Sequence, residues 1–233
     1  MKTFSLTIRN QMGSLNYISG HVRGDLKAYL TPPARNVNNP GQKTREAINQ
    51  IWRYLKQTKD YVLRFDRNIK PGKIEAYADA ELATADPETR RTVDGYAVII
   101  HGGIIATSSK GQASVSISST EAELKAATRC GQALVSIREF AMELQILKPD
   151  KPITIYEDNE PTRSIILSGR RNTRKGMEKD AFWICEKIAS GFFNCKSCNS
   201  GDMLADLMTK TSLPISSVEK HRTGMGIVPP PKL

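Results

Sequence analysis

Four acidic side chains stand at positions from which an α/β chain could gather them into one site. Asp79 ends one predicted strand, and Asp158 ends another. Glu123 lies in the first turns of the longest predicted helix, and Asp206 lies in a short predicted helix near the end of the chain. Because open α/β sheets place their sites where strand ends meet helix starts, we expect the four carboxylates to lie close together.

A cluster of carboxylates without a partnering histidine favours a hard cation, Mg²⁺ or Mn²⁺, over zinc. Two such ions roughly 3.5 to 4 Å apart can activate a water on one side of a phosphodiester and stabilise the leaving oxygen on the other. The chain has 34 Lys and Arg residues against 24 Asp and Glu residues, a net charge of +10, which favours a polyanionic partner. Together these features indicate phosphoryl transfer on nucleic acid, although each acid taken singly also suits a turn at a strand end.

The choice between Glu121 and Glu123 follows from the expected start of the longest helix. Ser118 and Glu121 have the spacing of a capping box, in which the hydroxyl and the carboxylate bind free amides of the first turn. Glu123 falls inside the apolar arc of the same helix, and a buried charge is normally neutralised, paired or bound to a metal. Glu123 is therefore the candidate ligand and Glu121 the fallback. The arc consists of Ala127, Cys130, Leu134, Ile137, Ala141 and Leu144.

The order of predicted elements indicates an α/β fold. Residues 73–213 are expected to form three strands, a helix, a strand, two helices, a strand and a last helix, with the helices covering a mixed sheet. The second and third strands are expected to join through Gly102-Gly103, and the longest helix is expected to run from Ser118 to about Leu147.

Residues 1–72 are expected to form a smaller, mainly helical segment without the residue types of a catalytic site. A helix capped by Asn39 is expected to end near Gln57, and Pro32-Pro33 is expected to break the chain before it. The predicted domains are thus 1–72, 73–213 and a C-terminal tail, 214–233. No apolar run is long enough to span a bilayer and no signal-peptide pattern begins the sequence, so we expect a soluble, intracellular protein with no membrane contact.

Five sequence runs resemble the ribonuclease H domain of Ty1/copia-type retrotransposon Pol polyproteins. They occur in the order typical of that family and together cover nearly all of residues 73–213. The segment before them is similar to the part that joins reverse transcriptase to its ribonuclease H, through Gly13-Ser14-Leu15-Asn16-Tyr17 and Arg53-Tyr54-Leu55-Lys56. The five runs are Tyr77-Ala78-Asp79-Ala80, Asp86-Pro87-Glu88-Thr89-Arg90-Arg91 with Gly95-Tyr96, Ser118-Ser119-Thr120-Glu121-Ala122-Glu123-Leu124, Tyr156-Glu157-Asp158-Asn159 and Leu204-Ala205-Asp206-Leu207-Met208-Thr209-Lys210.

The resemblance implies a ribonuclease H-like fold with a five-stranded mixed sheet, and an endonuclease that cuts the RNA strand of RNA·DNA hybrids. It implies that Asp79, Glu123, Asp158 and Asp206 are the catalytic and metal-binding quartet, that two Mg²⁺ ions are the cofactor with Mn²⁺ as a substitute, and that products carry 3′-hydroxyl and 5′-phosphate ends. The polymerase's own Tyr-x-Asp-Asp site is absent from the sequence. The polymerase part of the same polyprotein is a candidate partner, in a cytoplasmic virus-like particle or in the nucleus.

A basic run between two predicted helices could follow the phosphates of a duplex, with a solvated loop as the equal alternative. Histidines typical of the family are missing from residues 175–182, and none lies between Lys196 and Asp206, so slow product release is expected. This departure motivates the alternative function, a catalytically inactive or domesticated fragment that binds nucleic acid or packs in a larger assembly. The candidate nucleic-acid-binding residues are Arg163, Arg170, Arg171, Arg174 and Lys175.

Overall fold

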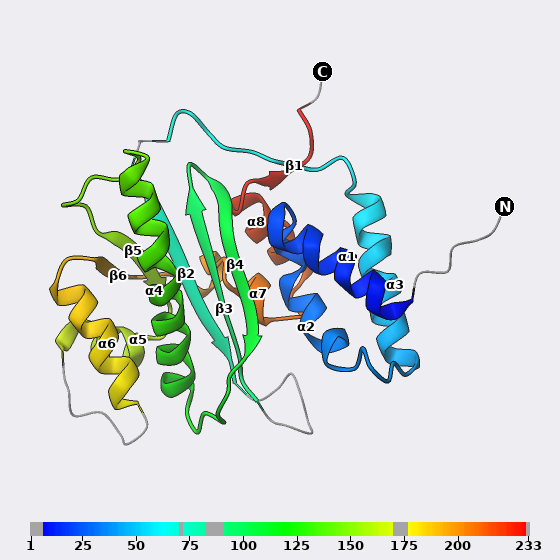
Figure 1. The fold of residues 1–233 in the computed structure, drawn as a ribbon, viewed down its shortest axis with the longest axis horizontal. Coiled ribbons are helices and arrows are strands. Elements are labelled where there is room, and N and C mark those ends of the chain that lie inside the picture. The colour runs from blue at the N-terminus through cyan, green and yellow to red at the C-terminus, as the bar shows by residue number, and fades with distance from the viewer. Residues whose placement is uncertain (1–6, 70–71, 83–90, 170–176, 232–233) are drawn as a thin grey trace.

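A computed structural model describes residues 7–69, 72–82, 91–169 and 177–231, and its centre is a five-stranded sheet (Figure 1). The strand order is β4-β3-β2-β5-β6, in which β4, β3 and β2 pair antiparallel, whereas β2, β5 and β6 pair parallel. This five-stranded mixed sheet, flanked by helices, confirms the predicted α/β architecture. The strands are β2 (Ile74–Glu81), β3 (Val93–Ile100), β4 (Gly103–Gly111), β5 (Ile153–Glu157) and β6 (Phe193–Ser197).

Helices cover both faces of the sheet, as Figure 1 shows. Alternating residues of β2 point to opposite faces, so Ile74, Ala76 and Ala78 pack into the core beneath the long helix, whereas Tyr77 packs against the cluster on the other face. The first face is covered by α4 (Ser119–Glu143) with α5 (Glu160–Ser168) and α6 (Glu178–Ala189), and the second by the short helix α7 (Asp206–Thr209).

Three residues with positive φ mark where the central elements end. The hairpin between β3 and β4 turns at His101 and Gly102, with φ of 50° and 74°, one residue earlier than predicted. Helix α4 ends at Glu143 rather than near Leu147, because Gln145 has a left-handed φ of 58° and the amides of the next two residues donate to Ala141 O.

The N-terminal segment is helical, as predicted, and has its own core. Helix α3 ends at Gln57 as expected but begins at Gln42, because Gly41 rather than Asn39 is its N-cap. Pro32 and Pro33 lie inside a helix instead of interrupting one, and that helix ends two residues later. The elements are α1 (Ile8–His21), η1 (Gly24–Leu26), α2 (Lys27–Arg35) and α3 (Gln42–Gln57), and the buried core residues are Met12, Leu15, Leu26, Leu30, Ile48 and Ile51.

The last segment folds back onto the N-terminal one. Residues 214–228 contain helix α8 (Ile215–Gly224) and strand β7 (Ile227–Val228), which pairs antiparallel with β1 (Val62–Leu63). Arg222 of α8 donates a 3.0 Å hydrogen bond to the Tyr54 hydroxyl, which in turn donates a 2.7 Å hydrogen bond to the buried Asp25. In the described part of the chain, no helix combines the length and apolar character that crossing a membrane requires.

Candidate active site

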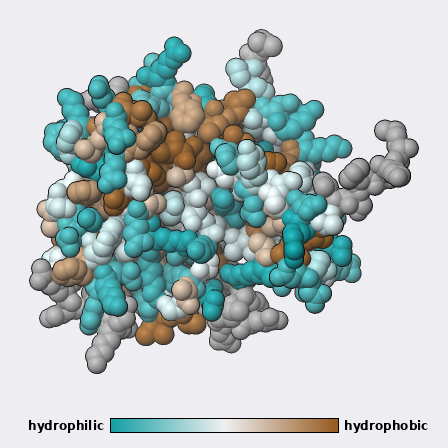
Figure 2. All heavy atoms as spheres, in the orientation of Figure 1, coloured by the Kyte–Doolittle hydropathy of each residue, from teal (hydrophilic) through white to brown (hydrophobic). Residues whose placement is uncertain are grey.

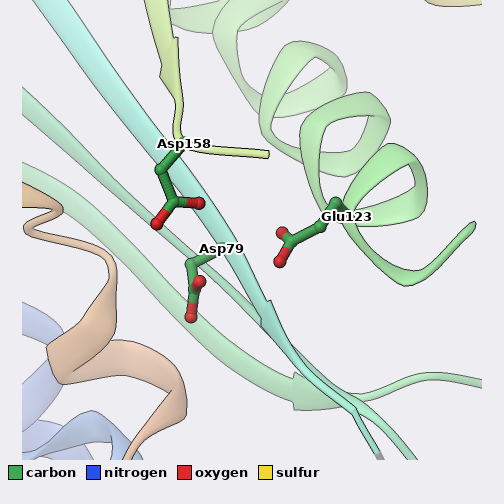
Figure 3. A group of neighbouring side chains, drawn as sticks. All are labelled: Asp79, Glu123 and Asp158. Atoms are coloured by element: carbon green, nitrogen blue, oxygen red, sulfur yellow. The ribbon is translucent and has the colours of Figure 1, made fainter. Parts of the chain in front are cut away.

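Three of the four predicted carboxylates meet at one end of the sheet (Figure 3). Asp79 comes from β2, Glu123 from the first turns of α4, and Asp158 from the residue directly after β5. One carboxylate oxygen of each lies within 4.8 Å of those of the other two. Because β2 and β5 are parallel neighbours, their carboxyl ends lie side by side, and this pairing carries the two aspartates to the same point.

The fourth predicted carboxylate, Asp206, lies beside this group through a lysine. The Lys210 Nζ lies 2.5 Å from Asp206 Oδ1 and 3.6 Å from Asp79 Oδ1. Lys210 follows Asp206 by four residues, which is about one helical turn, so the two side chains lie on the same side of the short helix α7. The sequence did not lead us to predict the contact of Lys210 with the acids. The available signal was the spacing of four residues between Asp206 and Lys210.

Gly95 allows α7 to approach Asp79 closely. Gly95 lies directly opposite Asp79 in the β2–β3 pair, and a Cβ at this position would lie 2.4 Å from Met208 Cβ and 2.9 Å from Thr209 Cγ2. The missing side chain lets the backbone of α7 lie on β3. As a result the Thr209 hydroxyl donates a short hydrogen bond to Asp79 Oδ2 and fixes the orientation of that carboxylate.

Glu121 caps the long helix, as predicted, and Glu123 lies on the buried side of the same helix. The Glu121 amide donates to Ser118 Oγ at 3.2 Å, and the Glu121 carboxylate accepts from Ile117 N at 3.0 Å and from Lys125 Nζ at 2.7 Å. Glu123 points inward and is only 6% exposed. Its Oε2 is buried and has no hydrogen-bond partner among the described residues. The prediction that Glu123 lies on the buried side of the helix is therefore confirmed.

Burial and mutual repulsion raise the pKa values of the clustered acids. Burial is the largest cause for Asp79, whose pKa rises to about 6 although Lys210 opposes the rise. Burial, followed by the charges of Asp79, Glu157 and Asp158, raises the pKa of Glu123 to about 10. A donor set made only of carboxylate oxygens, one of them buried and unsatisfied, fits a hard dication such as Mg²⁺ or Mn²⁺.

Glu157 is a buried acid that the sequence reasoning did not single out. It is fully buried, its Oε1 accepts from Asn159 N at 3.0 Å, and its Oε2 has no partner within the described residues. Burial raises the pKa of Glu157 well above its usual value, which favours its neutral form. Strand alternation was the signal for its inward direction, because Ile153 and Ile155 of β5 are also buried.

The candidate nucleic-acid-binding residues remain predictions. Arg163 lies in α5, where its guanidinium forms an ion pair with Glu160, with Nη2 2.6 Å from Oε2. The other four, Arg170, Arg171, Arg174 and Lys175, lie outside the described residues, as does most of the predicted turn from Asp86 to Arg91.

Comparison with known proteins finds similarity to retrotransposon polyproteins. The chain is 29% identical over 200 residues to the Retrovirus-related Pol polyprotein from transposon TNT 1-94 of Nicotiana tabacum. The aligned region covers 85% of this chain and 15% of that protein. The chain is also 29% identical over 227 residues to the Pol polyprotein from transposon RE2 of Arabidopsis thaliana, covering 95% of this chain and 15% of that protein. The chain thus spans about 15% of the length of these polyproteins.

Two further comparisons concern a shorter relative and solved structures. Secreted RxLR effector protein 161 of Plasmopara viticola is 33% identical over 124 residues, which is 53% of this chain and 86% of that protein. LC11 ribonuclease H1, isolated from compost, aligns with 64% of this chain and 97% of its own, at 15% identity and a TM-score of 0.46. Ribonuclease H1 of Halobacterium salinarum aligns with 59% of this chain and 95% of its own, at 15% identity and a TM-score of 0.41. No protein-family model matches the chain.

Proposed function

The chain is homologous to a segment of retrotransposon Pol polyproteins, and from this premise we propose that it is a metal-dependent endonuclease. Its substrate is the RNA strand of an RNA·DNA hybrid, and its products carry 3′-hydroxyl and 5′-phosphate ends. The observation that supports this proposal most is the convergence of Asp79, Glu123 and Asp158 within 4.8 Å from three separate elements.

Asp79, Glu123, Asp158 and Asp206 would hold two Mg²⁺ ions, or Mn²⁺ in their place. Bound there, the pair of ions supplies an activated water and stabilisation of the leaving oxygen. The protein's part is to bind and orient. Thr209 fixes one oxygen of Asp79, and the ammonium of Lys210 holds Asp206 beside it. Burial of Asp79 and Glu123 strengthens every electrostatic interaction within the site.

We also propose which partners the chain has within a whole polyprotein. A chain that spans about 15% of its relatives is expected to act beside the polymerase part of such a polyprotein, in a cytoplasmic virus-like particle or in the nucleus. The net charge of +10 supports binding of the hybrid through its phosphates, with Arg163 and the basic run from Arg170 to Lys175 as the proposed contacts.

A cleavage assay that compares RNA·DNA, RNA·RNA and DNA·DNA duplexes, with Mg²⁺ and with EDTA, tests the proposed reaction. We expect cleavage of the RNA strand of the hybrid alone, and only with Mg²⁺. Asp79→Asn and Asp158→Asn should each abolish cleavage, because each removes a charge that neutralises the dication. Glu121→Gln is the matched control, since Glu121 caps the helix instead of facing the cluster. Cleavage that survives either aspartate substitution would refute the assignment.

A second candidate, a nucleic-acid-binding chain without activity, is favoured by one observation. The ammonium of Lys210 contacts both Asp206 and Asp79, so the protein itself supplies a cation to this pair. In this case the purified chain binds hybrid with a steep dependence on salt and leaves it intact in both Mg²⁺ and Mn²⁺.

A further inference from the structure

A polar groove lies where the N-terminal segment meets the free edge of the sheet. It has a volume of about 320 Å³ and lies between α2, the end of β4 and one residue of α1. Figure 2, in the orientation of Figure 1, shows hydrophobic residues gathered in the upper part of this face and mostly hydrophilic residues in its lower half, where β4 ends. The polar lining residues are Asn16, Lys27, Thr31, Arg35 and Ser109, and Gly111 completes one wall.

The three elements that line this groove carry basic side chains and no acidic ones. The elements α1, α2 and β4 carry Arg9, Lys27, Arg35 and Lys110. Lys27 is half-buried, and this burial lowers the pKa of its ammonium with no acid to oppose the shift. In the described part of the chain, Lys27 has neither an ion pair nor a side-chain hydrogen bond. Because the Lys27 ammonium has no partner among the described residues and remains partly exposed, it is available to an anion from solution.

Hydrogen-bonding groups of the kind that a phosphate uses surround the same groove. The hydroxyls of Thr31 and Ser109 are hydrogen-bonded to each other at 2.8 Å, and Thr31 Oγ1 also lies 3.3 Å from Lys27 O. When Thr31 donates to Lys27 O or to Ser109, the Ser109 hydroxyl can turn its hydrogen toward a ligand. The guanidinium of Arg35 reaches the end of β4, where a Cβ on Gly111 would lie 3.3 Å from Arg35 Nη2. The ammonium of Lys27 and the Ser109 hydroxyl beside it, with the positive charge of Arg35 near the end of β4, suit an anionic oxygen such as that of a phosphate.

The groove lies at the same end of the sheet as the carboxylates. Asp79 is paired in register with Gly95, and Gly95 is paired in register with Ser109. Side chains at paired positions point to the same face, and neighbouring strands are about 4.8 Å apart, so Ser109 lies roughly 10 Å from Asp79 along this row. Along a duplex, each strand places a phosphate at about every 3.4 Å of axis. A duplex with one phosphate at the carboxylates therefore has others within reach of the groove.

We propose that the groove around Lys27 binds a backbone phosphate of the hybrid whose scissile phosphate lies at the carboxylates. This site deepens the proposed function and rests on it, because the ligand is the same duplex. It gives the N-terminal helical segment a role in holding the substrate, which its sequence did not indicate. The contact is made to phosphate alone and therefore adds affinity without sequence preference.

The test measures binding of a fluorescent RNA·DNA hybrid to the full chain by anisotropy, in EDTA, at several salt concentrations. Lys27→Met keeps the packing of the aliphatic stem and removes the charge. We expect roughly fivefold weaker binding and a fall of about 1 in the slope of log affinity against log salt. Lys27→Arg should restore most of the affinity. Lys151→Met is the matched control, because Lys151 is exposed and precedes β5 at the opposite end of the sheet.

The outcomes separate this site from the proposed reaction. Unchanged affinity and slope in Lys27→Met, or an equal loss in Lys151→Met, would overturn the phosphate site even if the wild-type chain cleaves hybrid. A wild-type chain that binds no hybrid overturns it as well. If the wild-type chain binds hybrid and the Lys27→Met variant loses affinity as expected, but no cleavage occurs in Mg²⁺, the phosphate site stands and the proposed reaction fails. Thermal unfolding of each variant confirms that the fold is retained.

Discussion

Replacing Glu123 by Gln should stabilise the metal-free protein at neutral pH. Burial, and then the neighbouring acids, raise the pKa of Glu123 from the usual 4.5 to about 10. The folded chain therefore binds more protons than the unfolded chain between these two values, and stability falls as pH rises through this window. Each pH unit costs about 1.4 kcal/mol, so the loss accumulated from pH 4.5 to pH 7 is at most about 3 kcal/mol.

Glutamine has the shape of the protonated acid and cannot ionise, so the variant should recover this free energy. We expect urea unfolding in EDTA to show Glu123→Gln more stable than the wild-type chain by up to about 3 kcal/mol at pH 7. At pH 4.5 the difference should largely vanish, because the wild-type carboxyl is then protonated in the folded state. Glu121→Gln should be neutral or destabilising, since hydrogen bonds from Lys125 and Ile117 outweigh burial and lower the pKa of Glu121.

Adding Mg²⁺ should reverse the order of the two proteins. A dication bound only by the folded state stabilises it by about 2.7 kcal/mol at a hundredfold excess over its dissociation constant. The wild-type chain should gain this stability and the Glu123→Gln variant should gain much less, because it lacks one charged ligand. The reasoning fails if the variant is less stable than the wild-type chain in EDTA at pH 7, or if both proteins respond equally to Mg²⁺.

Further substitutions test the packing of α7 on the sheet, the charge of Lys210 beside the acids, and the contact of α8 with the N-terminal segment. Gly95→Ala places a Cβ 2.4 Å from a side-chain carbon of α7 and should lower the free energy of unfolding by about 1–3 kcal/mol in chemical denaturation. Gly13→Ala, its control in open space on α1, should raise the free energy of unfolding by about 0.5–1 kcal/mol. Lys210→Met removes an ammonium from the acids and should tighten Mg²⁺ binding in calorimetry; unchanged affinity would show that the ammonium does not compete with the ion. Tyr54→Phe removes the acceptor of Arg222 Nη1 and a hydrogen-bond donor to Asp25, and leaves Arg222 only the longer, 3.4 Å contact with the Tyr61 hydroxyl. It should cost about 1–3 kcal/mol, with faster amide exchange in α8; wild-type exchange would contradict this link.

Local patterns were sufficient to predict the position of each acid on its element. The helical wheel placed Glu123 inward, and the capping pattern gave Glu121 a separate role, because both follow from the period of one helix. Helix and strand boundaries were less accurate. Asn39-Pro40 has the residue types of a helix start, yet Gly41 takes the N-cap position, since packing rather than capping preference decides where a helix begins.

Contacts between distant segments could not be predicted in the same way. Thr209 reaches Asp79 only because Gly95 lets α7 lie on β3, and no local pattern reports which helix will cover a given glycine. The groove around Lys27 likewise requires α2 to lie beside the end of β4, 78 residues further along the chain for the Thr31–Ser109 pair. Local periodicity predicts which face of an element is buried but not which element buries it.

The two parts of the acidic site share one residue. Asp79 belongs to the group of three carboxylates, and it also accepts from Thr209 and lies near Lys210, which holds Asp206. Asp79, Glu123 and Asp158 would hold one dication, and Asp79 with Asp206 would hold the other, so Asp79 would serve both. In the proposed two-ion site the ammonium of Lys210 would have to leave Asp206, because the ammonium and a dication would need the same carboxylate oxygens. Neutralising Asp79 should for this reason weaken binding of both ions, whereas neutralising Asp206 should weaken only one.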